Sequence, residues 1–173
     1  MRQLDYIDLD VALQHTALAG RVPRCFAVMH KLIEVETAKA LLAEASEWSI
    51  WKWLLEKRRV REIADRGTEA LDRVEKKVKA GWSAELRKTY REAGREDSNG
   101  IDPKLRAALR RVKEADEIAD DARLDAEATF DEAERRLSAD MAREGALKAI
   151  TAYELREKAI RKAESVGRPR ETQ

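Results

Sequence analysis

The amino-acid sequence predicts an all-α protein, with a long antiparallel helical hairpin that packs like a coiled coil and a small helical head at the N-terminus. Its three prolines, Pro23, Pro103 and Pro169, leave two long stretches without a helix breaker. Charged residues make up 40 % of the 173 residues and aromatic residues only 5 %. A composition rich in Ala, Leu, Glu, Lys and Arg is typical of long helices.

We expect three parts along the chain: a head over 1–55, a hairpin stalk over 56–166 and a frayed tail over 167–173. The most apolar stretch, which follows Pro23, belongs to the head and is expected to be buried on most sides. A short helix is expected before it, ending at Gly20.

The second arm of the stalk is expected to be one helix from Asp102 to Val166. Asp102 followed by Pro103 is a strong start signal, and the next firm stop is Gly167. Gly145 interrupts this run without ending it. Its apolar stripe is mostly alanine, which lets a second helix approach closely.

The first arm continues an apolar stripe to Tyr90, and residues 23–95 fit either one helix or two. Gly81 and Ser83 are the expected place for a break, with Ser83 as the cap of the second piece. The polar segment near 94–102 reads as the loop between the arms. Two long helices joined by a short loop are expected to pack antiparallel.

The expected register places Arg95 opposite Pro103. Phe130 then meets Gly67 and Thr68, a large side chain against small ones. The same register sets acidic residues of the second arm opposite basic residues of the first, and it brings Ile150 and Tyr153 to the tryptophans. The expected charge partners are Asp116, Asp120, Asp121 and Asp125 with Arg73, Lys76, Lys77 and Lys79, and Asp140 and Glu144 with residues 57–61.

The sequence predicts no catalytic residue, no cofactor and no metal site, so we expect a protein that is not an enzyme. His15, His30 and Cys25 are the only soft metal ligands, and the Glu-x-x-His pattern of di-iron bundles does not occur. Cys25 lies among apolar residues, where an inert thiol is expected. No phosphate-binding glycine loop or nucleophile elbow is found.

Tryptophan and arginine gather around residues 48–61, a composition typical of interaction hot spots and also of helices at membrane surfaces. Packing in the core of the head is the third interpretation. The candidate interaction residues are Trp48, Trp51, Trp53, Arg58, Arg59 and Trp82.

These observations predict a structural or adaptor protein that acts through helix–helix contacts and self-associates, with a dimer favoured. Ile63, Ile118 and Leu124 are apolar positions that a two-helix stalk leaves uncovered. The formal net charge of +1 argues against nucleic acid as a partner. No membrane span or signal peptide is recognised, so a cytoplasmic location is expected. The alternatives are a peripheral membrane protein and a ligand- or metal-binding head around His15, Cys25 and His30.

Overall fold

The computed structural model describes residues 32–92 and 102–167, and in these residues the protein is all-α, as the sequence predicts. The expected short helix before Gly20 and the candidate ligands His15, Cys25 and His30 lie outside the described residues. The helices are α3 (Ile33–Ala45), α4 (Ile50–Ala80), α5 (Ala84–Glu92), α6 (Pro103–Arg136) and α7 (Ala139–Gly167).

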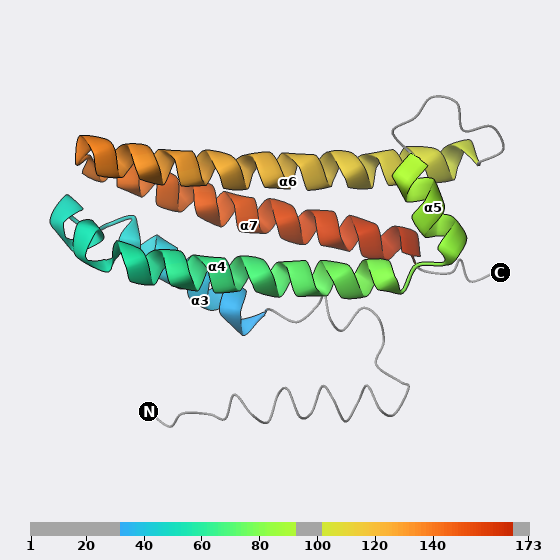
Figure 1. Ribbon diagram of the computed structural model, residues 1–173, viewed down its shortest axis with the longest axis horizontal. Coiled ribbons are helices and arrows are strands. Elements are labelled where there is room, and N and C mark those ends of the chain that lie inside the picture. The colour runs from blue at the N-terminus through green and yellow to red at the C-terminus, as the bar shows by residue number, and fades with distance from the viewer. Residues whose placement is uncertain (1–31, 93–101, 168–173) are drawn as a thin grey trace, which may run out of the picture.

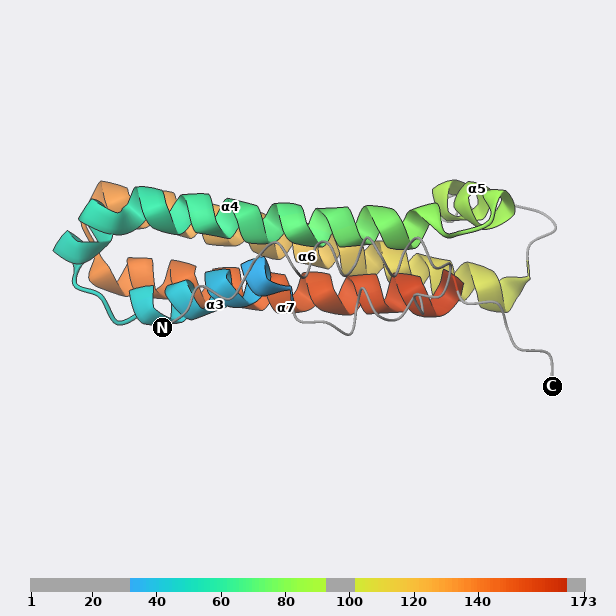
Figure 2. The ribbon, with the colours of Figure 1, turned by 90° about the horizontal axis from the view of Figure 1, so that it is seen from below.

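The helices form an elongated bundle of two layers. Figures 1 and 2 show α4 and α6 in one layer and α3 and α7 in the other. The helix α7 packs against α3, α4 and α6, and its contact with α6 is the most extensive. The short α5 closes one end of the bundle, whereas the α3–α4 and α6–α7 connections lie at the opposite end (Figure 1).

The expected single helix from Asp102 to Val166 is wrong, because the chain reverses at Leu137 and Ser138. Leu137 has a left-handed backbone with φ 50°. The N–H of Ser138 donates to the carbonyl of Ala133 at 3.0 Å, and the N–H of Leu137 donates to that of Glu134 at 3.4 Å. These two bonds form a Schellman C-cap. The Ser138 hydroxyl then accepts from the N–H of Met141 at 3.3 Å and caps α7.

This reversal changes the partner of each half of the expected helix. Phe130 faces Gly145 of α7 rather than Gly67: a Cβ atom on Gly145 would lie 2.6 Å from the Phe130 ring. Lys79 does meet Asp116, at 2.8 Å, so one of the expected charge contacts between the two arms is present.

The other expected charge pairs are replaced because α7 occupies the space next to α6. Asp125 pairs with Lys148, and Asp120 pairs with Arg156 of α7. Glu144 also pairs with Lys148 and not with residues 57–61. Two of the four basic residues of that run, Lys57 and Arg61, bind Glu134 of α6.

The predicted helix start at Asp102 and the predicted break at Gly81 and Ser83 are confirmed. Asp102 accepts from the N–H of Lys104 at 2.9 Å, with Pro103 in the first turn. The first arm breaks at Gly81, and the Ser83 hydroxyl accepts from the N–H of Leu86 at 3.1 Å. One unforeseen break separates α3 from α4, where Ser49 caps the new helix. The helix α4 then runs without interruption through position 55, where the head was expected to end.

The main core lies between α3, α4, α6 and α7, and a smaller cluster surrounds Trp82 where α4 ends. Ile63 packs at the edge of the main core, whereas Ile118 and Leu124 are exposed on α6. Across the described residues, no helix combines the length and the apolar composition needed to cross a membrane.

Candidate functional site

The six candidate interaction residues divide into buried and exposed groups. Trp53 is fully buried and stacks on Phe130 of α6, with ring centroids 4.9 Å apart. Trp82 is also buried, and its indole N–H donates to the carbonyl of Ala163 at 3.1 Å. These two side chains hold α4 onto α6 and α7, so in the folded chain they contribute to its core.

Trp48 is half-buried at the α3–α4 connection. Its indole N–H donates to Glu44 at 3.2 Å, and the ammonium group of Lys52 lies 4.4 Å from its ring centroid. It also packs against the main core. The contacts of Trp48 are therefore local, and they fix the entry of the chain into α4.

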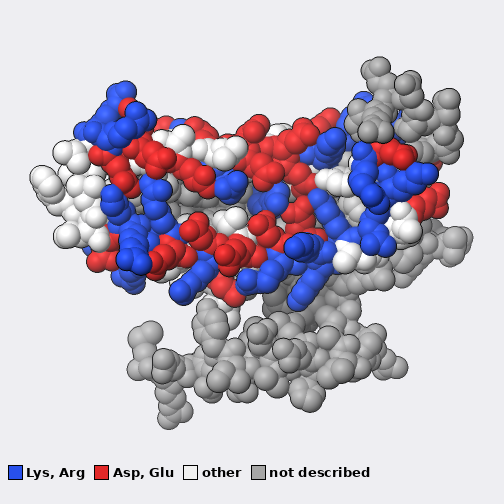
Figure 3. Space-filling view, viewed as in Figure 1, with Lys and Arg blue, Asp and Glu red and all other residues white. Residues whose placement is uncertain are grey.

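The remaining candidates lie together on the outer face of α4. Trp51 is 70 % exposed and Leu55 is 84 % exposed. Residues four apart on a helix are neighbours on one face, and the exposed Arg58 and Arg59 follow one turn later. We call Trp51, Leu55, Arg58 and Arg59 the end patch. Figure 3 shows uncharged side chains gathered at this end of the bundle, with Lys and Arg on both sides.

Among the residues that the structure describes, the arginines of the end patch pair with neighbours on their own helix. Arg58 pairs with Glu62 at 3.0 Å, and Arg59 pairs with Glu56 at 3.5 Å. Exposed pairs of this kind contribute little stability. Each guanidinium has five N–H donors, so donors remain for a partner.

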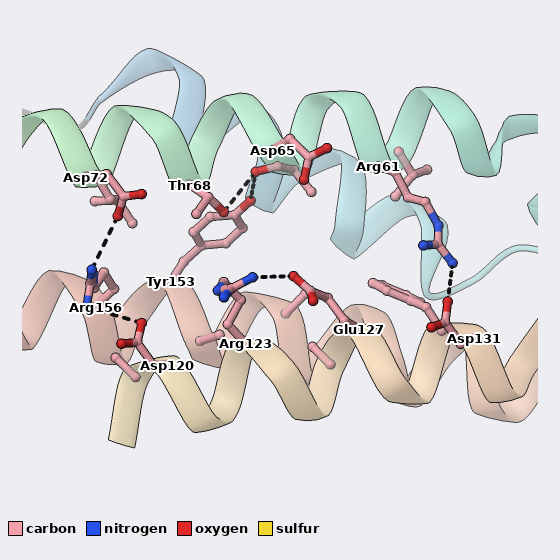
Figure 4. A pocket seen from close by; sticks show the side chains of 18 residues that line it. Arg61, Asp65, Thr68, Asp72, Asp120, Arg123, Glu127, Asp131, Tyr153 and Arg156 are labelled. Carbon is pink, nitrogen blue, oxygen red and sulfur yellow. Dashed lines mark hydrogen bonds and ion pairs between the residues drawn. The ribbon is translucent and has the colours of Figure 1, made fainter. Parts of the chain in front are cut away.

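A second feature is a cavity of about 480 Å³ between α4 and α6, with α7 as its floor. We call this cavity the basin (Figure 4). Figure 3 shows the same face of the molecule hollowed between the side chains of the two helices. The apolar lining is contributed mainly by Val60, Ala64, Leu71, Ala119, Ala126, Phe130, Ala149, Ala152 and Tyr153.

Ion pairs close both ends of the basin (Figure 4). At one end Arg61 of α4 reaches Asp131 and Glu134 of α6, both at 2.8 Å, and the bond to Asp131 raises the pKa of Arg61. At the other end Arg156 rises from the floor to Asp72 at 3.3 Å and to Asp120 at 3.5 Å. Burial alone would lower the pKa of Arg156, but the surrounding carboxylates outweigh it and raise the pKa.

Tyr153 crosses the floor of the basin from α7 to α4. Its hydroxyl donates to the carbonyl of Ala64 at 2.5 Å, and the Thr68 hydroxyl donates to the same carbonyl at 3.2 Å. Gly67 makes this approach possible, because a Cβ atom there would lie 2.9 Å from the tyrosine oxygen. Burial raises the pKa of Tyr153 to about 12, so the hydroxyl is neutral at pH 7 and acts as a hydrogen-bonding group.

The charged groups of the basin are unequally satisfied. The lining includes five carboxylates and three guanidinium groups. Arg61 and Arg156 bind the carboxylates named above, and Arg123 binds Glu127 at 2.5 Å. Asp65, on the α4 side, has no cationic partner among the residues that the structure describes. The basin is therefore an acidic cavity with an apolar floor.

The groups that line the basin are apolar side chains, ion-paired charges and hydrogen-bonded hydroxyls. Within the two described ranges no three His, Cys, Asp or Glu side chains are grouped so as to hold a metal ion. The basin contains no histidine or cysteine, and its tyrosine hydroxyl is held by a backbone carbonyl.

Three of the four end-patch residues, Trp51, Arg58 and Arg59, were among the six sequence candidates, whereas Trp53 and Trp82 lie in the core and the basin was not predicted. The lining of the basin comes from α4, α6 and α7, and it forms only because α7 folds back onto α6. The signal for that fold-back was the pair Leu137-Ser138, a serine cap without a glycine or proline beside it.

Comparisons with known protein families, with curated proteins and with solved structures found no match, so the geometry alone supports a function.

Proposed function

We propose that this chain is a non-enzymatic structural or adaptor protein that forms a homodimer through helix–helix contacts at the end patch. The observation that supports the proposal is the exposure of Trp51 and Leu55, one turn apart on α4. Large apolar side chains that remain in water on neighbouring positions mark interaction sites. Tryptophan and arginine are also the residues most enriched in binding hot spots.

A second copy fits this surface because the surface is self-complementary. An antiparallel crossing of two α4 helices about a twofold axis near Leu55 places Leu55 against its own copy. The Arg59 guanidinium of each chain then reaches the Trp51 indole of the other, a favourable cation–π arrangement. The Leu55 pair lies on the twofold axis, and the Arg59–Trp51 contact occurs twice, as a twofold interface requires.

The expected affinity is moderate. Burial of one Trp and one Leu from each chain contributes about 1.5–3 kcal/mol per side chain. Association costs at least about 4 kcal/mol in lost translational and rotational freedom. The dimer should therefore dissociate on dilution.

The test is the solution mass by size-exclusion chromatography with multi-angle light scattering over a series of concentrations. We expect the mass to rise from that of the 19.8 kDa monomer toward twice that value. Leu55→Glu should hold the protein at the monomer mass at all concentrations. The matched control is Leu124→Glu, at a leucine on α6 that is 53 % exposed, and it should dimerise like the parent.

A parent that stays monomeric, or a Leu124→Glu variant that loses the dimer equally, would contradict the proposal. Co-sedimentation of a monomer with phosphatidylserine vesicles at low salt would instead favour a peripheral membrane protein. That second candidate is supported by Arg58 and Arg59 beside Trp51, because tryptophan and basic residues together suit an anionic interface. Circular dichroism of each variant checks that the bundle is intact.

A further inference from the structure

We propose that the basin binds a small organic cation with an apolar body, with Asp65 as the counter-ion of its ammonium group. The basin does not include Trp51, Leu55, Arg58 or Arg59. The inference is therefore independent of the proposed dimer.

The shape of the basin favours a small molecule over a peptide helix. The Arg61–Asp131 bridge crosses from α4 to α6 at one end, and Arg156 links the floor to both sides at the other. A helix could lie along the groove only if these pairs broke. The volume of about 480 Å³ is within the range of roughly 300–1,000 Å³ that small-molecule pockets occupy.

The floor suits an apolar body. Small side chains open the space: Ala64, Ala126, Ala149 and Ala152 line it together with the rings of Phe130 and Tyr153. An aryl or short alkyl group could bury its surface against these residues. Aromatic rings near a bound ammonium group also attract its positive charge.

The polar groups select a cation. Each guanidinium group of the lining already binds a carboxylate of the protein, whereas Asp65 does not bind a cation in the described part of the chain. An anionic ligand would meet an excess of carboxylates and would have to compete for arginines that are already paired. An ammonium group gains a charge-assisted hydrogen bond, roughly twice as strong as a neutral one.

Three acceptors converge where the ammonium group would lie. Figure 4 shows Asp65, Thr68 and the hydroxyl of Tyr153 close together on the α4 side of the basin. Both hydroxyls use their protons on the Ala64 carbonyl, so their oxygen atoms remain as acceptors. An alkylammonium group carries three N–H donors, which matches this set.

The test is an NMR titration of the full ¹⁵N-labelled chain with phenethylammonium. Phenethyl alcohol and 3-phenylpropionate serve as the neutral and anionic analogues of similar shape. We expect saturable shifts at Ala64, Thr68, Ala126 and Tyr153 with the cation, binding about tenfold weaker with the alcohol, and no binding of the anion.

Asp65→Asn should reduce the affinity for the cation to that for the alcohol. Its matched control is Glu69→Gln, which removes one negative charge from an exposed position of the same helix outside the basin, and it should leave the titration unchanged. The Leu55→Glu variant should bind the cation like the parent, which separates this test from that of the dimer. Equal affinities for the three probes, shifts away from the basin, no saturation at millimolar concentrations, or an unchanged affinity in Asp65→Asn would each overturn the proposal.

Discussion

At the scale of single residues, the bundle depends on glycines that lie beneath aromatic rings. Gly67 admits the Tyr153 hydroxyl to the backbone of α4, and Gly145 lies against the Phe130 ring. Glycine costs about 1 kcal/mol in helix propensity relative to alanine. A methyl group at either position would displace a large aromatic side chain, so each glycine leaves room for its aromatic neighbour.

The contact between Gly67 and Tyr153 can be measured with a double-mutant cycle. Gly67→Ala should lower the free energy of unfolding by about 1 kcal/mol or more, because overpacking of about 1–3 kcal/mol exceeds the gain in helix propensity. Tyr153→Phe should cost about 1 kcal/mol through the lost hydrogen bond to Ala64. The double variant should lose less than the sum, because the tyrosine oxygen no longer blocks the new methyl group.

Urea unfolding followed by circular dichroism supplies the free energies. The control cycle combines Gly145→Ala with Tyr153→Phe. It should be additive, because the close neighbour of Gly145 is Phe130. Additivity in the Gly67 cycle as well would show that the hydroxyl is not what excludes a side chain at position 67.

At the scale of elements, the turn between α6 and α7 decides the fold. Leu137 adopts a left-handed conformation that non-glycine residues rarely take, and its side chain is about half exposed. The left-handed conformation costs about 1–2 kcal/mol for such a residue. The turn persists because α7, once reversed, packs along α6 and also against α3 and α4.

Leu137→Gly should therefore raise the free energy of unfolding by up to about 1 kcal/mol, since glycine adopts this conformation without a steric penalty. Part of the gain is offset by the greater freedom of glycine in the unfolded chain. Thermal and urea melts measure the change. Leu147→Gly, at a similarly exposed leucine inside α7, should instead cost about 1 kcal/mol. Equal losses in both variants would mean that the backbone at Leu137 is not strained.

At the scale of the whole molecule, a polar network joins four helices near α5. The Lys79 ammonium group of α4 binds Asp116 of α6 at 2.8 Å and the Tyr90 hydroxyl of α5 at 3.2 Å. Tyr90 donates to Asp116 at 2.6 Å. Glu75 binds both Lys79 and Arg156 of α7. The network therefore fixes how α5 closes the bundle.

This network predicts the response of the molecule to alkaline pH. Burial, with the help of Asp116, raises the pKa of Tyr90 to about 12, and burial raises that of Tyr153 to about 12. The ordinary value is about 10. Between these values the unfolded chain releases protons that the folded chain keeps, so the stabilisation is fully present below pH 10 and is lost as the pH rises toward 12. The raised pKa of Lys79 acts in the same direction.

Urea unfolding at a series of pH values from 8 to about 12 measures this effect. The free energy of unfolding should be level up to about pH 9 and should then fall. Tyr153→Phe should show a shallower fall, because it removes one of the hydroxyls whose pKa is raised in the described part of the chain. A parent and variant with the same dependence on pH would exclude Tyr153 as a contributor.

The fold class and several helix ends could be predicted from the sequence, and Trp51, Arg58 and Arg59 of the end patch were among its candidates. These features depend on local chemistry: helix propensity, the caps at Asp102 and Ser83, and an outer helix face that holds Trp51 and Leu55. The proximity of Lys79 and Asp116 was also expected from the antiparallel register, whereas the other expected pairs between these arms are replaced by ion pairs with α7. Dimerisation remains a prediction that the solution mass will test.

Only the tertiary structure decided how the helices pair and where the basin lies. An alanine-rich stripe on a helix packs well against several partners, so the stripe of 103–166 alone does not distinguish one straight helix from two that fold back on each other. The expected match of Phe130 with Gly67 failed for this reason, since Gly145 offers the same space at a shorter distance along the chain. The burial of α7 against three helices stabilises the left-handed turn at Leu137, and that gain arises only when the whole bundle is assembled.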